Sequence, residues 1–331
     1  MENIVGKKIS VKKLASQYTT LFTFVLMLLV LSVLTKGAIL KWVSIKNLLI
    51  AESVRAFAAL GVGMIIITWG IDLSIGYVVC LTASIAASFA QDPTFAAAMY
   101  QGQNFPLIVP IVAALVVGLL FGTFNGILVA YGNIHPFIAT LGSMCIARGL
   151  QLIYTKAAVV GSLKDTYKNM SQGTIGPIPN LALFVIIAAF LIWVLMAHTR
   201  LGSNYYAIGG NRQAALVSGI NVKRDLVSVY AIAGLLYGCA GALLASRLGL
   251  ANSLTANGME LDAIAAVTVG GVSQTGGVGT VPGMLIGVLT LGLINYGMSY
   301  LGLDSYYQQI VKGAIIIIAV YFDMRKYARN N

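Results

Sequence analysis

Long apolar stretches alternate with short polar ones along almost the whole chain. A helix needs about 20 consecutive apolar residues to cross the hydrocarbon core of a bilayer, and ten stretches approach or exceed that length. The stretch 259–274 is short and ends in glycines, which predicts a broken or re-entrant helix near residues 259–280. The pattern predicts an all-α integral membrane protein, a bundle of about ten transmembrane helices at residues 18–35, 48–69, 73–90, 106–130, 136–154, 180–198, 227–247, 259–274, 280–300 and 307–323.

Composition agrees with a chain whose main solvent is lipid. Of its 331 residues, 58% are hydrophobic and 9% are charged, against roughly 25% charged in soluble domains. No polar segment approaches the ~100 residues of a usual soluble domain. We therefore expect one transmembrane domain at 18–324 with a cytoplasmic loop at 199–226, a cytoplasmic N-terminal segment at 1–17 and a cytoplasmic tail at 325–331.

The net charge of +11 arises from Lys and Arg residues that cluster near the ends of the spans. In a soluble protein this charge would suggest a nucleic-acid partner, but at span ends basic residues orient the chain, with the more basic side in the cytoplasm. We therefore expect both termini in the cytoplasm and no nucleic-acid partner. Eleven basic residues lie on that side and six on the other: Lys7, Lys8, Lys12, Lys13, Arg200, Arg212, Lys223, Arg224, Arg325, Lys326 and Arg329 against Lys36, Lys41, Lys46, Lys156, Lys164 and Lys168.

Glycines that repeat every four residues in two spans predict close helix packing. Lipid supplies no hydrophobic force between helices, so faces of small residues let backbones approach and gain dispersion contacts. Packing within the bundle and a subunit interface would both use such faces. The two sets are Gly118, Gly122 and Gly126, and Gly279, Gly283 and Gly287.

The polar segment 199–226 contains a short helix with recognisable ends. Asn211 is placed to cap a helix over residues 212–218, and Gly219 is placed to end it in the left-handed conformation. Two helical turns are unstable alone in water, so the apolar residues 214–217 must pack on something else. Two interpretations stay open: a surface turn packed on its own bundle, or a contact with a partner subunit.

The chain lacks the sequence patterns of an enzyme. ATP binding needs G-x-x-x-x-G-K-[ST], and the glycines of GGVSQTGGVG at 270–279 lack the lysine; they suit a break or a tight turn in a membrane segment. H-E-x-x-H and G-x-S-x-G are absent, and the two histidines are isolated. The three cysteines are also isolated in apolar segments. We expect no catalytic residue, no metal site and no cofactor bound by this chain.

Six segments carry a resemblance to a known family. They read WGIDLSIG at 69–76, NGILVAYGNIHPFIATLGSMCIARGL at 125–150, TRLGSNYYAIGGNRQAALVSGINV at 199–222, ELDAIAAVTVGGVSQTGGVGTVPG at 260–283, NYGMSYLG at 295–302 and YYQQIVKGAIIIIAVYFDMRKYAR at 306–329. Through them the chain resembles, over nearly its whole length, the permease subunits of bacterial ABC importers of the ribose and galactose type, nearest to the methyl-galactoside kind. Trp69 departs from the pattern, because many members have glycine there.

The resemblance implies a transport subunit of the bacterial inner membrane that moves a monosaccharide into the cytoplasm. It implies three partners: an ABC ATPase subunit that holds ATP and Mg, an extracytoplasmic sugar-binding protein, and a second permease copy in a homodimer. It also implies that the polar segment docks on the ATPase through Gly209, Gly210, Asn211, Arg212, Ala214, Ala215, Leu216, Ser218 and Gly219.

Polar side chains within spans are costly in lipid and are candidates for the solute path. These candidates are Asp72, Asn125, Arg148, Glu260 and Asn295. Structural roles compete in each case: a helix cap for Asp72, interhelical hydrogen bonds for the asparagines, and an ion pair or a snorkelling side chain for Arg148 and Glu260. For Arg55, Arg247, Asp262 and Lys312 we expect structural pairing.

Other transport classes fit the sequence less well. An ion-driven secondary transporter usually places ionisable groups at the bilayer midplane, whereas most such groups here lie nearer the span ends. A passive channel would need no polar segment like 199–226. A permease for a nucleoside or an autoinducer-type sugar stays open as an alternative.

Overall fold

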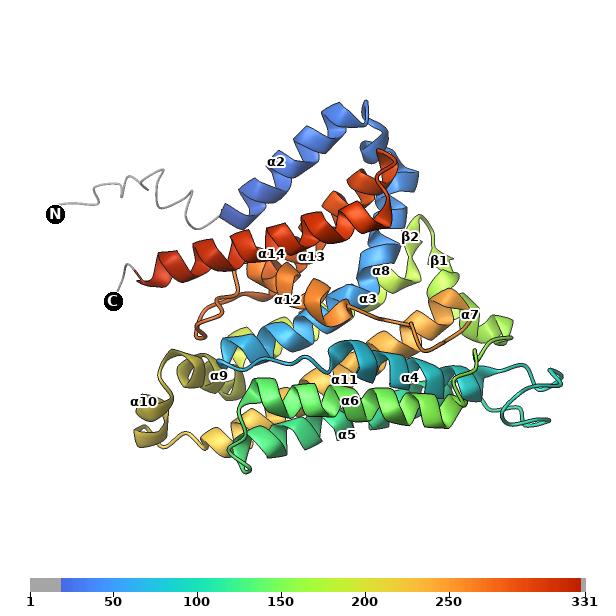
Figure 1. Cartoon of the computed structure of the whole chain (residues 1–331), viewed down its shortest axis with the longest axis horizontal. Coiled ribbons are helices and arrows are strands. Elements are labelled where there is room, and N and C mark those ends of the chain that lie inside the picture. The colour runs from blue at the N-terminus through green and yellow to red at the C-terminus, as the bar shows by residue number, and fades with distance from the viewer. Residues whose placement is uncertain (1–18, 329–331) are drawn as a thin grey trace, which may run out of the picture.

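The computed structural model describes residues 19–328, and helices form nearly all of its regular structure (Figure 1). The expected N-terminal segment 1–17 and residues 329–331 of the expected tail lie outside the described residues. The ten predicted spans correspond to α2 (Thr19–Leu34), α3 (Trp42–Ile67), α4 (Ile75–Ala90), α5 (Ile108–Ala130), α6 (Pro136–Thr155), α8 (Asn180–His198), α11 (Val222–Leu248), α12 (Met259–Val269), α13 (Val281–Tyr300) and α14 (Ser305–Ala328). The all-α class is therefore confirmed.

Six of these helices have both the length and the hydropathy of a full membrane span: α3, α5, α6, α8, α11 and α13. Others are shorter, because α2 and α4 have 16 residues and α12 has 11. At 1.5 Å per residue, α12 is about 16 Å long, roughly half of a ~30 Å hydrocarbon core. It lies between Gly258, with φ 77°, and Gly271, with φ 88°, and so has the form of a broken helix.

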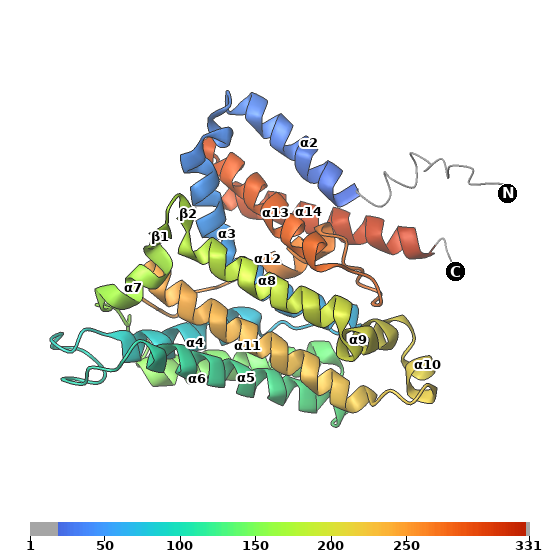
Figure 2. The same cartoon turned by 180° about the vertical axis from the view of Figure 1, so that it is seen from behind.

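The connecting elements are short and lie at the two ends of the bundle. One end holds α9 (Arg200–Gly210) and α10 (Arg212–Val217), and on the same side α2 begins and α14 ends (Figure 1). The opposite end holds η1 (Ala38–Leu40), α7 (Asp165–Gln172) and the strand pair β1 (Thr174–Ile175) and β2 (Ile178–Pro179) (Figure 2). The first residue of α2 and the last residue of α14 therefore lie on the α9–α10 side.

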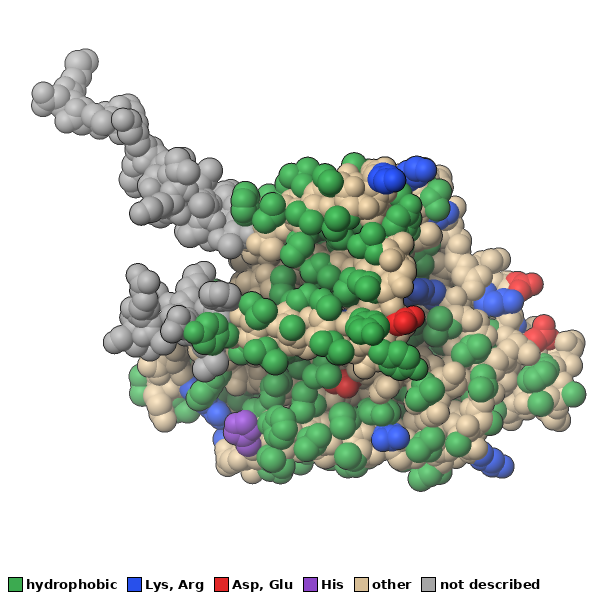
Figure 3. All heavy atoms as spheres, turned by 45° about the horizontal axis from the view of Figure 1, so that its top comes forward, with side chains coloured by type: hydrophobic (Ala, Val, Ile, Leu, Met, Phe, Trp, Pro, Cys, Tyr) green, Lys and Arg blue, Asp and Glu red, His purple; other side chains and the backbone are tan. Residues whose placement is uncertain are grey.

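The centre of the bundle is formed by α3 and α11. From Ala56 to Ile67 every side chain of α3 is buried, and α11 packs against α3, α4 and α5. Large apolar side chains of α2, α5 and α8 are exposed instead, as expected where lipid is the solvent. Figure 3 shows hydrophobic side chains over most of one face, with acidic and basic side chains set among them.

The chain between α3 and α4 is extended although it lies inside the bundle. After α3 ends at Ile67, residues 68–74 run back toward the middle of the protein, which is why α4 begins only at Ile75. Backbone without helical hydrogen bonds is tolerated at membrane depth only where protein or water satisfies it. Here the Thr140 hydroxyl accepts from the Leu73 amide at 3.1 Å, and the Tyr230 hydroxyl donates to the Ile71 carbonyl at 3.1 Å.

Both glycine sets lie at close helix contacts. A Cβ on Gly118 or Gly122 would overlap the backbone of α11 at Gly234, and Gly283 and Gly287 face α12 in the same way. Gly279 differs from the prediction, because α13 begins only at Val281 behind the Thr280 cap. It lies in the preceding segment and not on the helix face, although a Cβ there would still crowd α3.

Candidate functional site

The helix α10 begins and ends with the local capping pattern that the sequence predicts. The Asn211 Oδ1 accepts from the Ala214 amide at 2.9 Å and starts α10, which ends at Val217 with Ser218 as its C-cap. Gly219 follows with φ 84°. Asn221 then caps α11 by accepting from the Arg224 amide at 3.1 Å. The central span therefore starts at Val222, earlier than the expected residue 227.

The two faces of α10 have different surroundings. Ala215 is buried against Ala130, Ile208, Val222 and Leu226 of the same chain. Leu216 is 57% exposed and Val217 is 85% exposed, although both are apolar. Ala215 therefore packs on its own bundle and is not the exposed partner contact that we expected. Among the residues that the structure describes, the next two side chains are largely uncovered.

The helix α9 is fixed firmly to the membrane helices beside it. Gly209 lies against the Ile67 carbonyl at the end of α3, and a Cβ at this position would overlap it. The Gly277 amide donates to the same carbonyl at 2.8 Å, and the Tyr206 hydroxyl donates to the Gly279 carbonyl at 2.9 Å. Burial raises the pKa of Tyr206 above its ordinary value, so the phenol remains a donor. Thus α9 contacts both α3 and the segment that follows α12.

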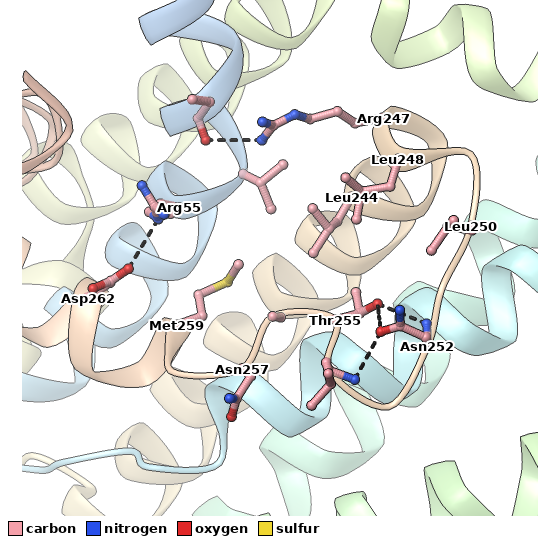
Figure 4. A pocket seen from close by; sticks show the side chains of 14 residues that line it. Arg55, Leu244, Arg247, Leu248, Leu250, Asn252, Thr255, Asn257, Met259 and Asp262 are labelled. Atoms are coloured by element: carbon pink, nitrogen blue, oxygen red, sulfur yellow. Dashed lines mark hydrogen bonds and ion pairs between the residues drawn. The ribbon is translucent and has the colours of Figure 1, made fainter. Parts of the chain in front are cut away.

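A polar cavity of about 410 Å³ lies nearer the opposite side of the bundle, between α3, the end of α11 and the start of α12 (Figure 4). The guanidinium of Arg247 donates to the Ala51 carbonyl at 3.2 Å. The Asn252 Oδ1 accepts from the Leu254 amide at 2.9 Å and from the Thr255 hydroxyl at 3.2 Å. The lining also contains Asn257 and several apolar side chains, among them Leu244, Leu248 and Met259.

Ion pairs join three helices at one edge of this cavity. The Arg55 Nη1 lies 2.5 Å from the Glu52 Oε1, and its Nε lies 3.4 Å from the Asp262 Oδ2. The Lys312 Nζ of α14 lies 3.1 Å from the Asp262 Oδ1. Arg55 lies in the middle of α3 and not near its end, contrary to the expected position of most ionisable groups. The structure pairs these charges within one network.

Two predicted path residues meet in a buried cluster away from the cavity. Asp72 and Asn125 are each 1% exposed, and Ser74 joins them. The Ser74 hydroxyl donates to the Asp72 Oδ1 at 2.6 Å and accepts from the Asn125 Nδ2 at 3.0 Å. Asp72 is not the helix cap that we expected, because Ser74 occupies the N-cap position and Asp72 lies two residues earlier.

The other three predicted path residues belong neither to this cluster nor to the lining of the cavity. Arg148 is exposed on α6, with its guanidinium 5.3 Å from the centre of the Tyr77 ring. The Glu260 carboxylate lies against Gly76 at the start of α4. Asn295 is half-buried on α13. None of the three is among the residues that line the cavity.

Sequence reasoning missed the segment 249–258, which supplies the amides and the hydroxyl of the cavity. Its Asn252, Thr255 and Asn257 lie outside the spans and form no known motif. The one usable signal was their position between an apolar span and a glycine-bounded short helix. Among the described residues, no group of three or more His, Cys, Asp or Glu side chains could hold a metal ion.

Comparisons with known proteins find similar permeases over most of the chain. Residues 44–320 match the family described as branched-chain amino acid transport system / permease component. The chain is 42% identical over 316 residues to the galactose/methyl galactoside import permease protein MglC of Haemophilus influenzae, covering 92% of this chain and 94% of the relative. It is 39% identical over 308 residues to the ribose import permease protein RbsC of Bacillus subtilis, covering 92% and 91%. No solved structure gives a significant match.

Proposed function

Because the chain belongs to the family of permease components of ABC importers, within its ribose and galactose type, we propose that it carries a monosaccharide across the inner membrane into the cytoplasm. The chain is a multi-pass membrane protein, and its relatives are named as import permeases. A galactose-like sugar is the proposed solute, since one galactose/methyl galactoside permease is 42% identical to the chain and the ribose permease is 39% identical. Two other galactose/methyl galactoside permeases are also 39% identical, so ribose is the alternative solute. ATP hydrolysis, with its ATP and Mg, belongs to a separate ATPase subunit.

The observation that carries the proposal is the exposed apolar end of α10. A six-residue helix is too short to be stable alone, yet Asn211 caps it and Ala215 anchors it to the bundle. Leu216 and Val217 are left in contact with water, where apolar surface is unfavourable unless a partner covers it. An ATPase subunit with an apolar groove is the partner that fits an importer. Gly209, Gly210, Arg212, Ala214, Ser218 and Gly219 flank this contact.

The same proposal implies an orientation in the membrane. The ATPase is in the cytoplasm, so the α9–α10 side is cytoplasmic, together with the start of α2 and the end of α14. The expected excess of basic residues on that side supports this. The opposite side, with α7 and the segment 91–107, then faces the sugar-binding protein. Residues 18–324 act as one permease domain.

A second copy of the chain is the proposed partner within the membrane. Arg55, Asp262 and Lys312 have side chains that are 31%, 21% and 27% exposed. Charged groups facing lipid at this depth would cost about 2.5–3.5 kcal/mol each on insertion scales. A second permease copy would cover this face and enclose a passage, and the polar cavity lies at its edge. Such symmetric pairing is the commonest form of assembly.

The test is co-purification followed by reconstitution. The chain is isolated from its native membrane in mild detergent, accompanying subunits are identified, and the complex is placed in liposomes with the binding protein. We expect an ATPase subunit to co-purify and its ATP hydrolysis to rise when the binding protein carries D-galactose. Isolation of the chain alone, with sugar uptake that follows an ion gradient, would overturn the proposal.

A further inference from the structure

The polar cavity lies beside the start of α12, a short helix that meets a second short helix, α4, outside the lining of the cavity. α4 starts at Ile75 after the extended segment, and α12 starts at Met259 after the segment 249–258. Their first turns are in contact, with the Glu260 carboxylate against Gly76. Both helices therefore present N-terminal ends inside the bundle. Transporters often form solute sites at such breaks, because irregular backbone there has polar groups that regular helices lack.

The charges around the cavity nearly cancel. Arg55, Arg247 and Lys312 carry three positive charges, and Glu52 and Asp262 carry two negative ones. Most of them are already paired: Asp262 contacts both Arg55 and Lys312, and Glu52 contacts Arg55. An anion or a cation would have to compete with these pairs. The balance therefore favours a neutral solute.

The lining offers donors and acceptors together with an apolar surface. Arg247 donates one N–H group to the Ala51 carbonyl. A guanidinium has five N–H groups, so others are available to a ligand. Asn257 adds an amide that both donates and accepts, whereas the Thr255 hydroxyl is already used in two hydrogen bonds with Asn252. Met259 and four leucines supply an apolar part of the wall. Sugars present the matching pattern, since hydroxyl groups donate and accept while their C–H groups form apolar patches.

The size of the cavity also suits a small ligand. Its volume of about 410 Å³ lies within the ~300–1,000 Å³ of typical small-molecule sites. Two further pockets, of about 400 and 330 Å³, are lined almost entirely by apolar side chains of α3, α8, α11 and α13. Those pockets suit lipid chains and offer little to hydroxyl groups.

We propose that this cavity is a transient binding site for the free monosaccharide inside the permease, with Arg247 and Asn257 contacting its hydroxyl groups and Met259 its carbon skeleton. The inference rests on the proposed function, because it takes the sugar class from there. It adds the place: a site at the start of α12 that the sugar occupies after it leaves the binding protein.

The first test is protection of a cysteine in the cavity. Asn257→Cys is labelled with a water-soluble maleimide in membranes, with D-galactose or with sodium chloride of equal osmolality. We expect D-galactose to slow labelling of this variant. Asn47→Cys, at an equally exposed position of α3 outside the cavity, is the matched control and should label at one rate in both solutions. The unmodified chain gives the background from its own cysteines.

The second test is sugar uptake by the complete importer in liposomes. Asn257→Ala should lower the D-galactose uptake rate about two- to tenfold, the loss expected for one hydrogen bond to a neutral group. Arg247→Gln should lower it further, and Asn47→Ala should not change it. Equal labelling with and without D-galactose, together with normal uptake by Asn257→Ala, would overturn the site. Failure of the loaded binding protein to stimulate ATP hydrolysis in the unmodified importer would instead overturn the proposed function, because cysteine protection is measured without ATP.

Discussion

Replacing the exposed apolar side chains of α10 tests the ATPase contact most directly. In the double variant Leu216→Ser, Val217→Ser, two side chains that are 57% and 85% exposed become polar. Exposed positions without contacts in their own chain change stability by about 0.5 kcal/mol or less. The permease should therefore insert and accumulate normally, so that any defect reflects the missing partner contact.

The size of the defect follows from the area that docking would cover. Fully burying a Val or Leu side chain is worth about 1.5–3 kcal/mol, so the exposed fractions correspond to about 1–1.5 kcal/mol for Leu216 and about 1.5–2.5 kcal/mol for Val217. Ordering each side chain at an interface takes back about 0.5–1.5 kcal/mol. A net loss of about 1–2 kcal/mol remains, which weakens ATPase binding about five- to thirtyfold.

The assay measures the affinity of the purified ATPase subunit for the permease in detergent and, in parallel, sugar uptake in cells. Val159→Ser is the matched control, since Val159 is 61% exposed and lies in the connection between α6 and α7, far along the chain from α10. Ala215→Glu is unsuitable, because it would place a charge inside the cluster that anchors α10. Wild-type ATPase affinity in the double variant would refute the role of α10.

Three further predictions concern the cap, the helix packing and the ion pairs. Asn211→Ala should remove about 1 kcal/mol of stability from α10 and weaken ATPase binding. Asn221→Ala removes an equivalent cap from the long, packed α11 and should leave ATPase binding nearly unchanged. The affinity of the ATPase subunit for each variant is the measurement. Gly122→Leu should prevent close packing of α5 on α11 and lower the thermal stability of the detergent-solubilised protein, whereas Gly142→Leu, which has open space around it, should not. Asp262→Asn should lower stability by about 1–3 kcal/mol, less than for a fully buried pair because the side chains are partly exposed, and adding Lys312→Met should restore part of the loss in the same melting assay.

The positions of the long apolar helices are readable from the sequence because hydropathy is a local property of the chain. Each long apolar run has to be a helix in lipid, since only a helix satisfies its own backbone. The residue at which α4 starts could not be predicted from hydropathy. Residues 70–74 form no helix, and Thr140 and Tyr230, which are far away in the sequence, form hydrogen bonds with the backbone of Leu73 and Ile71. No local pattern in the sequence predicts those partners.

The candidate site also has a part that local sequence predicts and a part that only the folded structure decides. The cap and stop of α10 are local signals, and Asn211 and Gly219 act as the sequence predicts. Which side of α10 faces solvent is not local, because the run Ala214–Val217 is apolar all round and has no helical periodicity. Only the packing of Ala215 on Leu226 and its neighbours decides it. The cavity was missed because its amides come from a connecting segment that lies beside α3 only after folding.

The glycine-rich segment after α12 connects the proposed ATPase contact with the proposed solute cavity. Gly209 of α9 and the Gly277 amide both meet the Ile67 carbonyl, so α9 and this segment share one backbone contact. The segment continues α12, whose first turn carries Asp262 at the cavity edge. Left-handed glycines, Gly258 and Gly271, bound α12 at both ends, while its body packs closely on α13. In the importer that we propose, a displacement of α10 would therefore be passed through α9, the glycine-rich segment and α12 to the Asp262 ion pairs at the edge of the cavity.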